Sequence, residues 1–99
     1  MDLYVARAQI RRVGNSAHMS DLMDFKQPHR FEGKTFLSAR NQYEYDCVST
    51  RRRMLATTGY SEHMGRGHVI AAANDPLPWE AVPAAGLSRD IWKVACGKA

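Results

Sequence analysis

The stretch Thr35–Cys47 reads TFLSARNQYEYDC, and its side chains alternate with the period of a β-strand. One set is mostly apolar and predicts a buried face: Leu37, Ala39, Asn41, Tyr43, Tyr45 and Cys47. The other set is polar and predicts a wet face: Ser38, Arg40, Gln42, Glu44 and Asp46. A long strand with one buried and one solvated face is typical of an antiparallel sheet.

Turn signals on both sides of this stretch divide the rest of the chain into further strands. These signals are Gly14-Asn15, residues 26–33, residues 65–67 and residues 74–76. We predict strands over residues 3–13, 17–26, 35–48, 51–61 and 67–73, with a short strand over 79–82. Consecutive strands joined by short turns predict a meander of hairpins.

The C-terminal residues 88–96 predict a helix instead. Ser88 is a suitable N-cap and Gly97 a suitable C-terminal stop. Four apolar side chains at helical spacing form one stripe: Ile91, Trp92, Ala95 and Cys96. A helix this short is marginal alone and must dock on the sheet. We therefore predict an α+β fold: a mainly antiparallel β-sheet, a meander of five or six strands, with one C-terminal helix packed on it.

The chain has 99 residues, which a single hydrophobic core accounts for, so we expect one domain over residues 1–99. Its 44% hydrophobic and 24% charged residues are ordinary for a globular protein. No apolar run approaches the roughly 20 residues of a membrane span, so we expect no transmembrane segment. Met1 is followed by Asp2 with no signal peptide. This leaves open a cytosolic protein or a mature segment with an added start methionine.

The net charge of +4 comes from the first half of the chain, which holds ten of the fourteen basic residues. Its local peaks are Arg11-Arg12 and Arg51–Arg53. Nucleic-acid binders usually concentrate more positive charge on one element, so we expect no nucleic-acid partner. The charge favours mild attraction to acidic partners.

The two cysteines, Cys47 and Cys96, both lie on predicted buried faces, and a disulfide between them is geometrically reasonable. Closing a loop of about fifty residues would contribute on the order of 4 kcal/mol. The alternative is two buried free thiols. Zinc is not indicated, because the cysteines lack metal-site spacing.

Six segments, taken in order, carry a family resemblance that spans the chain: residues 10–15, 24–28, 42–47, 59–67, 79–83 and 87–98. Tyr45-Asp46-Cys47 in mid-chain and Trp92-Lys93-Val94-Ala95-Cys96-Gly97-Lys98 at the end are the most specific pieces. The chain resembles the surface-adhesin protein E-like family of Gram-negative bacteria.

The resemblance implies a curved sheet with the helix on its concave side and a Cys47–Cys96 bridge. It also implies an exported protein in the periplasm or on the cell surface, where disulfides persist. The best-known family member is a lipoprotein adhesin that binds host matrix proteins, so we expect an unknown protein partner of that kind. No cysteine stands near the start of this sequence, so lipid anchoring is not carried over.

Catalytic and metal chemistry find little support. His63 and His68 flank a turn that also holds Met64. Two imidazoles on such a turn would bind a surface metal or the edge of a haem only weakly. The simpler interpretation is a polar hairpin tip. Ser61, Glu62 and His63 are neighbours, but neighbours on a strand point to opposite faces. We expect no catalytic residue, no metal and no cofactor.

Two functions follow. The first is an exported, non-enzymatic binding module, adhesin-like, for a host or envelope protein. Its candidate contacts lie on the solvent face of the strands over 35–48 and 51–61 and on the loop that follows: Arg40, Arg51, Arg52, Arg53, His63 and His68. If the two strands pair through a tight turn at Ser49-Thr50, some of the three neighbouring arginines should lie near Arg40. The alternative is a periplasmic carrier of a small ligand, such as haem or a hydrophobic molecule, held between helix and sheet with Trp79 and Trp92 as walls.

Overall fold

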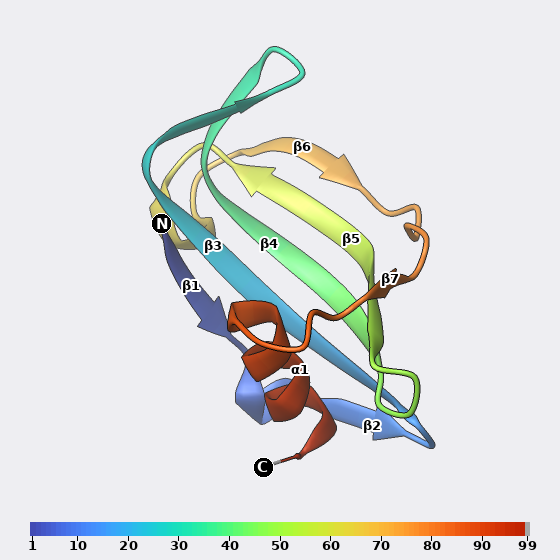
Figure 1. The fold of residues 1–99 in the computed structure, drawn as a ribbon. Helices are drawn as coiled ribbons and strands as arrows, with labels where there is room; N and C mark the ends of the chain where they lie inside the picture. The colour runs from blue at the N-terminus through green and yellow to red at the C-terminus, as the bar shows by residue number, and fades with distance from the viewer. Residues whose placement is uncertain (99) are drawn as a thin grey trace.

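The computed structural model describes residues 1–98 as a twisted sheet with one α-helix lying across it (Figure 1). Its strands are β1 (Asp2–Val5), β2 (Arg11–Val13), β3 (Ser16–Phe31), β4 (Lys34–Asp46), β5 (Arg51–Tyr60), β6 (Val69–Ala73) and β7 (Glu80–Ala81). The helix is α1 (Leu87–Cys96), and two short 3-10 helices are η1 (Arg7–Gln9) and η2 (His63–Gly65). Within residues 1–98, no helix has the length and apolar character needed to cross a membrane.

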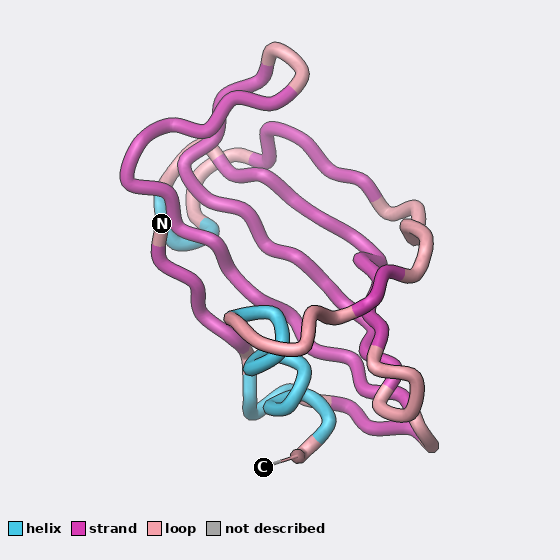
Figure 2. Tube along the Cα trace, in the orientation of Figure 1, coloured by secondary structure: helices cyan, strands magenta, loops and turns pink. Residues whose placement is uncertain are grey.

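All strand pairs are antiparallel, in the order β1-β3-β4-β5-β6, with β2 also paired to β3 and β7 to β5. The predicted meander is confirmed, because β2 to β6 follow one another both along the chain and across the sheet (Figure 2). The predicted strand over 3–13 is wrong in one respect: η1 divides it into β1 and β2. The sheet therefore has seven strands instead of five or six.

The hairpin of β3 and β4 is longer than its turn signals predict. We expected a turn over residues 26–33, yet β3 continues to Phe31 and β4 starts at Lys34. Only Glu32 and Gly33 turn the chain, with φ angles of 51° and 77°. Two residues with positive φ make the tight hairpin turn that matches strand twist. The strands stay paired because β3 absorbs residues 25–28 in a bulge.

Helix α1 packs on the concave face of the sheet, as predicted. Three side chains of its apolar stripe are buried: Ile91, Trp92 and Ala95. They pack in the core against Tyr45 of β4 and side chains of β3. The indole Nε1 of Trp92 also donates a 3.0 Å hydrogen bond to the backbone oxygen of Asp46. Gly97 ends the helix in the left-handed conformation, which confirms the predicted stop. The N-cap is Gly86 and not Ser88, because the helix starts one residue earlier than predicted.

A disulfide joins Cys47, next to the end of β4, to Cys96, the last residue of α1. The Cα atoms of the two cysteines are 5.6 Å apart, within the usual range for a disulfide. The predicted bridge between helix and sheet is therefore confirmed. It ties the C-terminal helix to a strand 49 residues away in sequence.

The predicted faces of β4 hold over most of the strand, because Ala39, Asn41 and Tyr45 are buried. Ser38, predicted to be wet, is fully buried. Its hydroxyl donates a 2.6 Å hydrogen bond to the backbone oxygen of Glu62 and accepts one from the Gly65 amide. The prediction fails because residues of a distant loop fold over this strand.

The bulge in β3 also changes the side chains opposite it. Leu37 was expected beside Ala39, but it lies on the side of η2, near Met64. Phe36 takes the concave position with Ala39 instead. Its ring packs over Gly59, where an added Cβ would come within 3.1 Å. Glycine at this position therefore lets the aromatic ring approach the sheet closely.

Candidate protein-binding surface

The part of the chain that projects farthest is the tip of the β3–β4 hairpin, residues 26–35, here called the projecting hairpin (Figure 1). Every residue in it is exposed. An aromatic cluster braces its base: the rings of Phe25 and His29 stack 4.8 Å apart, and Phe36 lies 5.3 Å from His29. A hairpin held by ring contacts and a tight turn presents its tip in a defined position.

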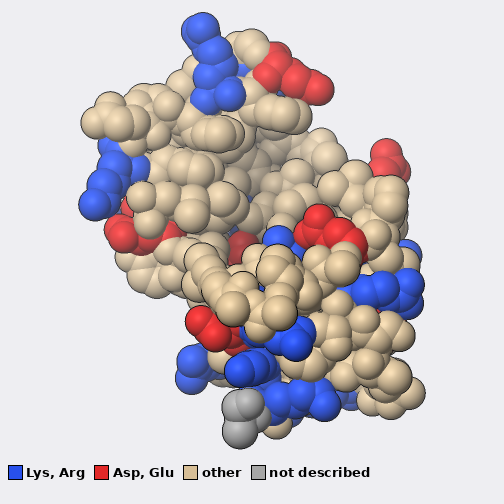
Figure 3. Space-filling view, viewed as in Figure 1, with Lys and Arg blue, Asp and Glu red and all other residues tan. Residues whose placement is uncertain are grey.

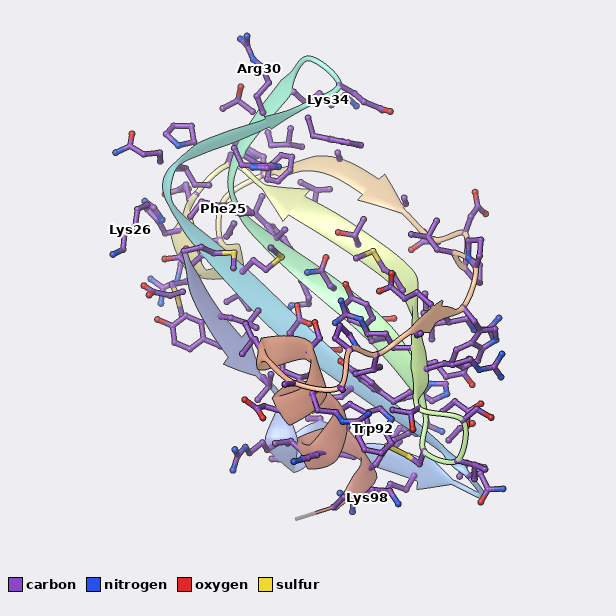
Figure 4. All side chains as sticks on the ribbon, viewed as in Figure 1. Phe25, Lys26, Arg30, Lys34, Trp92 and Lys98 are labelled. Carbon is purple, nitrogen blue, oxygen red and sulfur yellow. A yellow bond between two sulfur atoms is a disulfide. The ribbon has the colours of Figure 1, made fainter. Side chains whose placement is uncertain are left out.

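The projecting hairpin combines positive charge with one large apolar side chain. Lys26, Arg30 and Lys34 carry its positive charge (Figure 4), against a single acid, Glu32. Within residues 1–98, none of these three cations forms an ion pair. Phe31 at the tip is 61% exposed. An exposed aromatic side chain among cations is typical of a protein-binding site.

Residues 61–68, the η2 loop, fold against the convex face at the base of this hairpin. The carboxylate of Asp24 accepts a 2.9 Å hydrogen bond from the Met64 amide and lies 3.1 Å from Nδ1 of His63. The backbone hydrogen bond and the neighbouring imidazole lower the pKa of Asp24. Met64 has a positive φ of 58°, so the loop takes a sharp path. Asp24 therefore holds the loop to β3.

The two histidines of the η2 loop have different surroundings. His63 pairs with Asp24, whereas His68 is exposed and donates its backbone amide to the Ser61 hydroxyl at 2.8 Å. Among residues 1–98, no three histidine, cysteine or acidic side chains are placed to share a metal ion. The guanidinium of Arg40 reaches the same loop, 3.7 Å from a Cβ built on Gly65. Arg40 therefore lies against the loop that carries His63 and His68.

Arg51 and Arg53 lie elsewhere and have partners in the chain. Arg51 pairs with Asp46 at 2.9 Å, and Arg53 pairs with Glu44 at 2.7 Å. Their guanidinium groups both lie over the ring of Trp79, at 5.0 and 4.7 Å from its centroid. Arg51 and Arg53 share this indole ring, whereas Arg52 lies over Tyr43, because neighbouring residues of a β-strand point to opposite faces. Trp79 is thus clamped by arginines and is not a wall between helix and sheet.

Arg52 points to the concave side of the sheet. It pairs with Glu80 at 2.9 Å and lies over the ring of Tyr43. Its positive charge acts on the buried Asp21, which accepts a 2.9 Å hydrogen bond from the Asn41 amide. Burial is the larger influence and raises the pKa of Asp21. Arg52 therefore belongs to a partly buried polar group and is not part of an outward basic patch.

The expectation that some of these three arginines lie near Arg40 is wrong. The strands do pair next to a turn at Ser49-Thr50, with Asp46 opposite Arg51, but Arg40 lies opposite Thr58. That register places Arg40 roughly 13 Å along β4 from the position of Glu44, at about 3.3 Å per residue.

The space between helix and sheet does not form the pocket that the carrier hypothesis predicted. Trp92 fills it, since its side chain belongs to the buried core. A groove of about 370 Å³ lies instead on the uncovered part of the concave face, between the hairpin and β6. Its lining is mostly apolar and includes Phe36, Ala39, Met54 and Ala72. Figure 3 shows the hollow between these two parts of the sheet.

Sequence reasoning missed the projecting hairpin because the run from Lys26 to Gly33 contains Pro28 and polar residues. One signal was available, namely Glu32-Gly33 between two strand-like runs. A glycine at the second position of a two-residue turn is typical of a tight hairpin. Pro28 was read as part of a turn, but it sits in the bulge, where a missing amide hydrogen is tolerated.

Comparisons with known proteins agree with this architecture. A family model described as Surface-adhesin protein E matches residues 1–97. Among solved structures, the selenomethionine form of Haemophilus influenzae protein E has a TM-score of 0.76 at 13% identity, covering 96% of this chain and 78% of that one. Its crystal form II has a TM-score of 0.75 at 12% identity, covering 96% and 80%. Protein E from non-typeable Haemophilus influenzae has 0.73 at 12%, covering 96% and 69%. The comparison with curated proteins finds no match.

Proposed function

Because the chain belongs to the surface-adhesin protein E family, we propose that it is an exported, non-enzymatic module that binds a host or envelope protein. The family supports an adhesin-like surface protein. The disulfide supports export to the periplasm or the cell surface, because disulfides persist in oxidising compartments. Extracellular matrix proteins are the partners that this proposal favours.

The observation that carries the proposal is the exposure of Phe31 at the tip of a braced, basic hairpin. A rigid aromatic anchor loses little conformational freedom when it binds, and such anchors dominate protein interfaces. The surrounding cations speed association with acidic surfaces. We assign the contact surface to the projecting hairpin together with the η2 loop and Arg40, so that His63 and His68 lie within it.

That Arg51, Arg52 and Arg53 also contact a partner stays a prediction. Each of them already pairs with an acid of its own chain, so contact with a partner would require exchange of that ion pair. Reversing Arg53 to Glu and measuring its binding to the same matrix proteins as the wild-type chain would test this. Loss of affinity in Arg53→Glu with unchanged stability would add this region to the contact surface.

Surface plasmon resonance with immobilised, purified extracellular matrix proteins tests the proposal. We expect the wild-type chain to bind at least one of them, and Phe31→Ala to weaken that binding at least tenfold. Arg30→Gln should slow association, with the effect shrinking at high salt. Leu77→Ala is the matched control, since Leu77 is 53% exposed and lies outside the hairpin. Absence of binding to the whole panel, or equal losses in both alanine variants, would contradict the proposal.

The apolar groove favours a second candidate function, the carriage of a small hydrophobic molecule. Its volume of about 370 Å³ lies within the range of small-ligand sites. Ala73 lines it and pairs with Thr57, another lining residue, so Ala73→Trp should fill the space without touching the core under α1. Binding of 1-dodecanol by the wild-type chain and its loss in Ala73→Trp would support carriage. Absence of binding would reject it.

A further inference from the structure

The largest unbalanced charge of the molecule lies at the opposite end from the projecting hairpin. Residues 7–13 and 87–98 together hold six basic side chains, here called the basic end: Arg7, Arg11, Arg12, Arg89, Lys93 and Lys98. The same two segments contain one acid, Asp90, in the first turn of α1. The charge peaks read from the sequence did not identify this surface, because half of its members come from the C-terminal half of the chain.

The fold brings these two segments together around α1. Nε of Arg12 donates a 3.0 Å hydrogen bond to the backbone oxygen of Ala95, near the helix C-terminus. Arg89 and Lys98 lie over the same ring, that of Trp92, at 4.9 and 5.7 Å from its centroid. Figures 1 and 2 both show η1, which contains Arg7, beside the lower end of α1.

The basic end is not neutralised by the chain. None of its six side chains forms an ion pair with the residues that the structure describes, in contrast to Arg51, Arg52 and Arg53. Figure 3 shows lysine and arginine side chains gathered on and beside α1 at this end. Such a field attracts a partner with regularly spaced negative charges.

We propose that the basic end binds a sulfated glycosaminoglycan chain. Its cations come from the helix, a strand and η1, so they surround one end of the molecule and suit a flexible polyanion. The aromatic ring at its centre is unsuited to base stacking, because Trp92 is buried under Arg89 and Lys98. The lack of base stacking on Trp92 therefore favours a polysaccharide over a nucleic acid. This site is separate from the proposed protein-contact surface and does not depend on it.

The test measures heparin binding by the intact chain as a function of salt, for two matched variants. Lys93→Gln/Lys98→Gln removes two charges from the basic end, and Lys26→Gln/Lys34→Gln removes two from the projecting hairpin. The net charge of the two variants is therefore equal. We expect heparin affinity at 150 mM NaCl, a concentration of about physiological ionic strength, to fall at least tenfold in the first variant only. The slope of log affinity against log salt should fall by about two, roughly one for each lost contact.

Three results would overturn the proposal. The first is wild-type affinity for heparin no greater than for hyaluronan, which lacks sulfate. The second is equal loss in the two variants, which would show an effect of net charge alone. The third is tighter binding of a single-stranded DNA oligonucleotide than of heparin, which would indicate a nucleic-acid site. The hairpin variant keeps all six cations of the basic end, and the basic-end variant keeps the projecting hairpin. Loss of heparin binding and loss of matrix-protein binding can therefore be told apart.

Discussion

Single side chains in this protein act far from where their sequence neighbours suggest. Arg12 belongs to a run of two arginines, yet it binds the carbonyl end of a helix more than eighty residues away. Arg51 and Arg53 belong to a run of three, yet they clamp Trp79 and pair with acids of β4. Asp21 lies in a strand of mixed polarity but is buried. The partners of these groups, and not their spacing, determine what their charges do.

Asp21→Asn should change how stability depends on pH. Burial raises the pKa of Asp21 above its ordinary value of 3.8, so the folded chain binds this proton more tightly than the unfolded chain. Ionisation then costs folding free energy, and the cost appears as pH rises from 3.8 through the raised value. Asn resembles the neutral form and accepts the same hydrogen bond from Asn41. Urea denaturation should therefore show Asp21→Asn gaining stability relative to wild type between pH 4 and pH 8.

Asp24→Asn is the matched control with the opposite sign. The pKa of Asp24 is lowered in the folded chain, so its stabilising effect is present above pH 3.8 and is lost as pH falls below it. This variant should lose stability relative to wild type at pH 8 and approach it at low pH. Differences that do not vary with pH in either variant would show that the two carboxyl groups titrate normally.

Arg12→Ala should loosen the end of α1. The guanidinium donates to the backbone oxygens of Ala95 and Val94, at 3.0 and 3.3 Å, in the last turn of the helix, where carbonyl groups lack the regular partner four residues on. We expect a loss of about 1 kcal/mol in the free energy of unfolding, measured in urea. The neighbouring Arg11 lies on the opposite face of β2, so Arg11→Ala serves as the control. Equal losses in the two variants would show that the contact with the helix is unimportant.

At the scale of elements, α1 is the least self-sufficient part of the fold. Ten residues are too few for a stable isolated helix in water, so its order depends on contacts with the sheet. Those contacts are the buried faces of Ile91, Trp92 and Ala95, together with the disulfide. The long strands β3 and β4 support each other over many residue pairs and need no such anchor.

Replacing both cysteines, Cys47→Ser and Cys96→Ser, should detach α1 before the sheet melts. Opening a loop of 49 residues removes about 4 kcal/mol in the chain-entropy model. A domain of this size would then lose more than about 10 °C in Tm. The near-UV circular dichroism of Trp92 should be lost at a lower temperature than the far-UV signal of the sheet. Coincident transitions at the wild-type Tm would show that the disulfide does not hold the helix.

The sequence predicted the elements better than it predicted their contacts. The period of two in β4 and the stripe on α1 depend on local geometry, so Tyr45 and Trp92 were placed correctly in the core. Ser38 was misplaced because the η2 loop that buries it lies more than twenty residues away. The projecting hairpin was missed because strand pairing across a bulge overrides local turn preference. Of the predicted site residues, Arg40 reaches the η2 loop at Gly65, whereas the partners of Arg51–Arg53 are set by the register of the strands.

At the scale of the whole molecule, positive charge that is unpaired within residues 1–98 gathers at the two ends of the longest dimension, which is 37 Å. The projecting hairpin is basic at one end, and the segments around α1 are more basic at the other. The cations Arg51, Arg52 and Arg53, at the start of β5, are instead paired with acids. A module built in this way can hold a protein at one end and a polyanion at the other without competition between them.

Hydrogen–deuterium exchange of the chain, alone and with the matrix protein that it binds most tightly in the panel, tests the central claim most directly. A footprint measured in the complex identifies the contact surface without any substitution. The account predicts slower exchange in residues 26–35 and 61–68 of the complex, with α1 and β5 unchanged. Protection confined to β5 or to α1, with residues 26–35 exchanging as in the free chain, would contradict it.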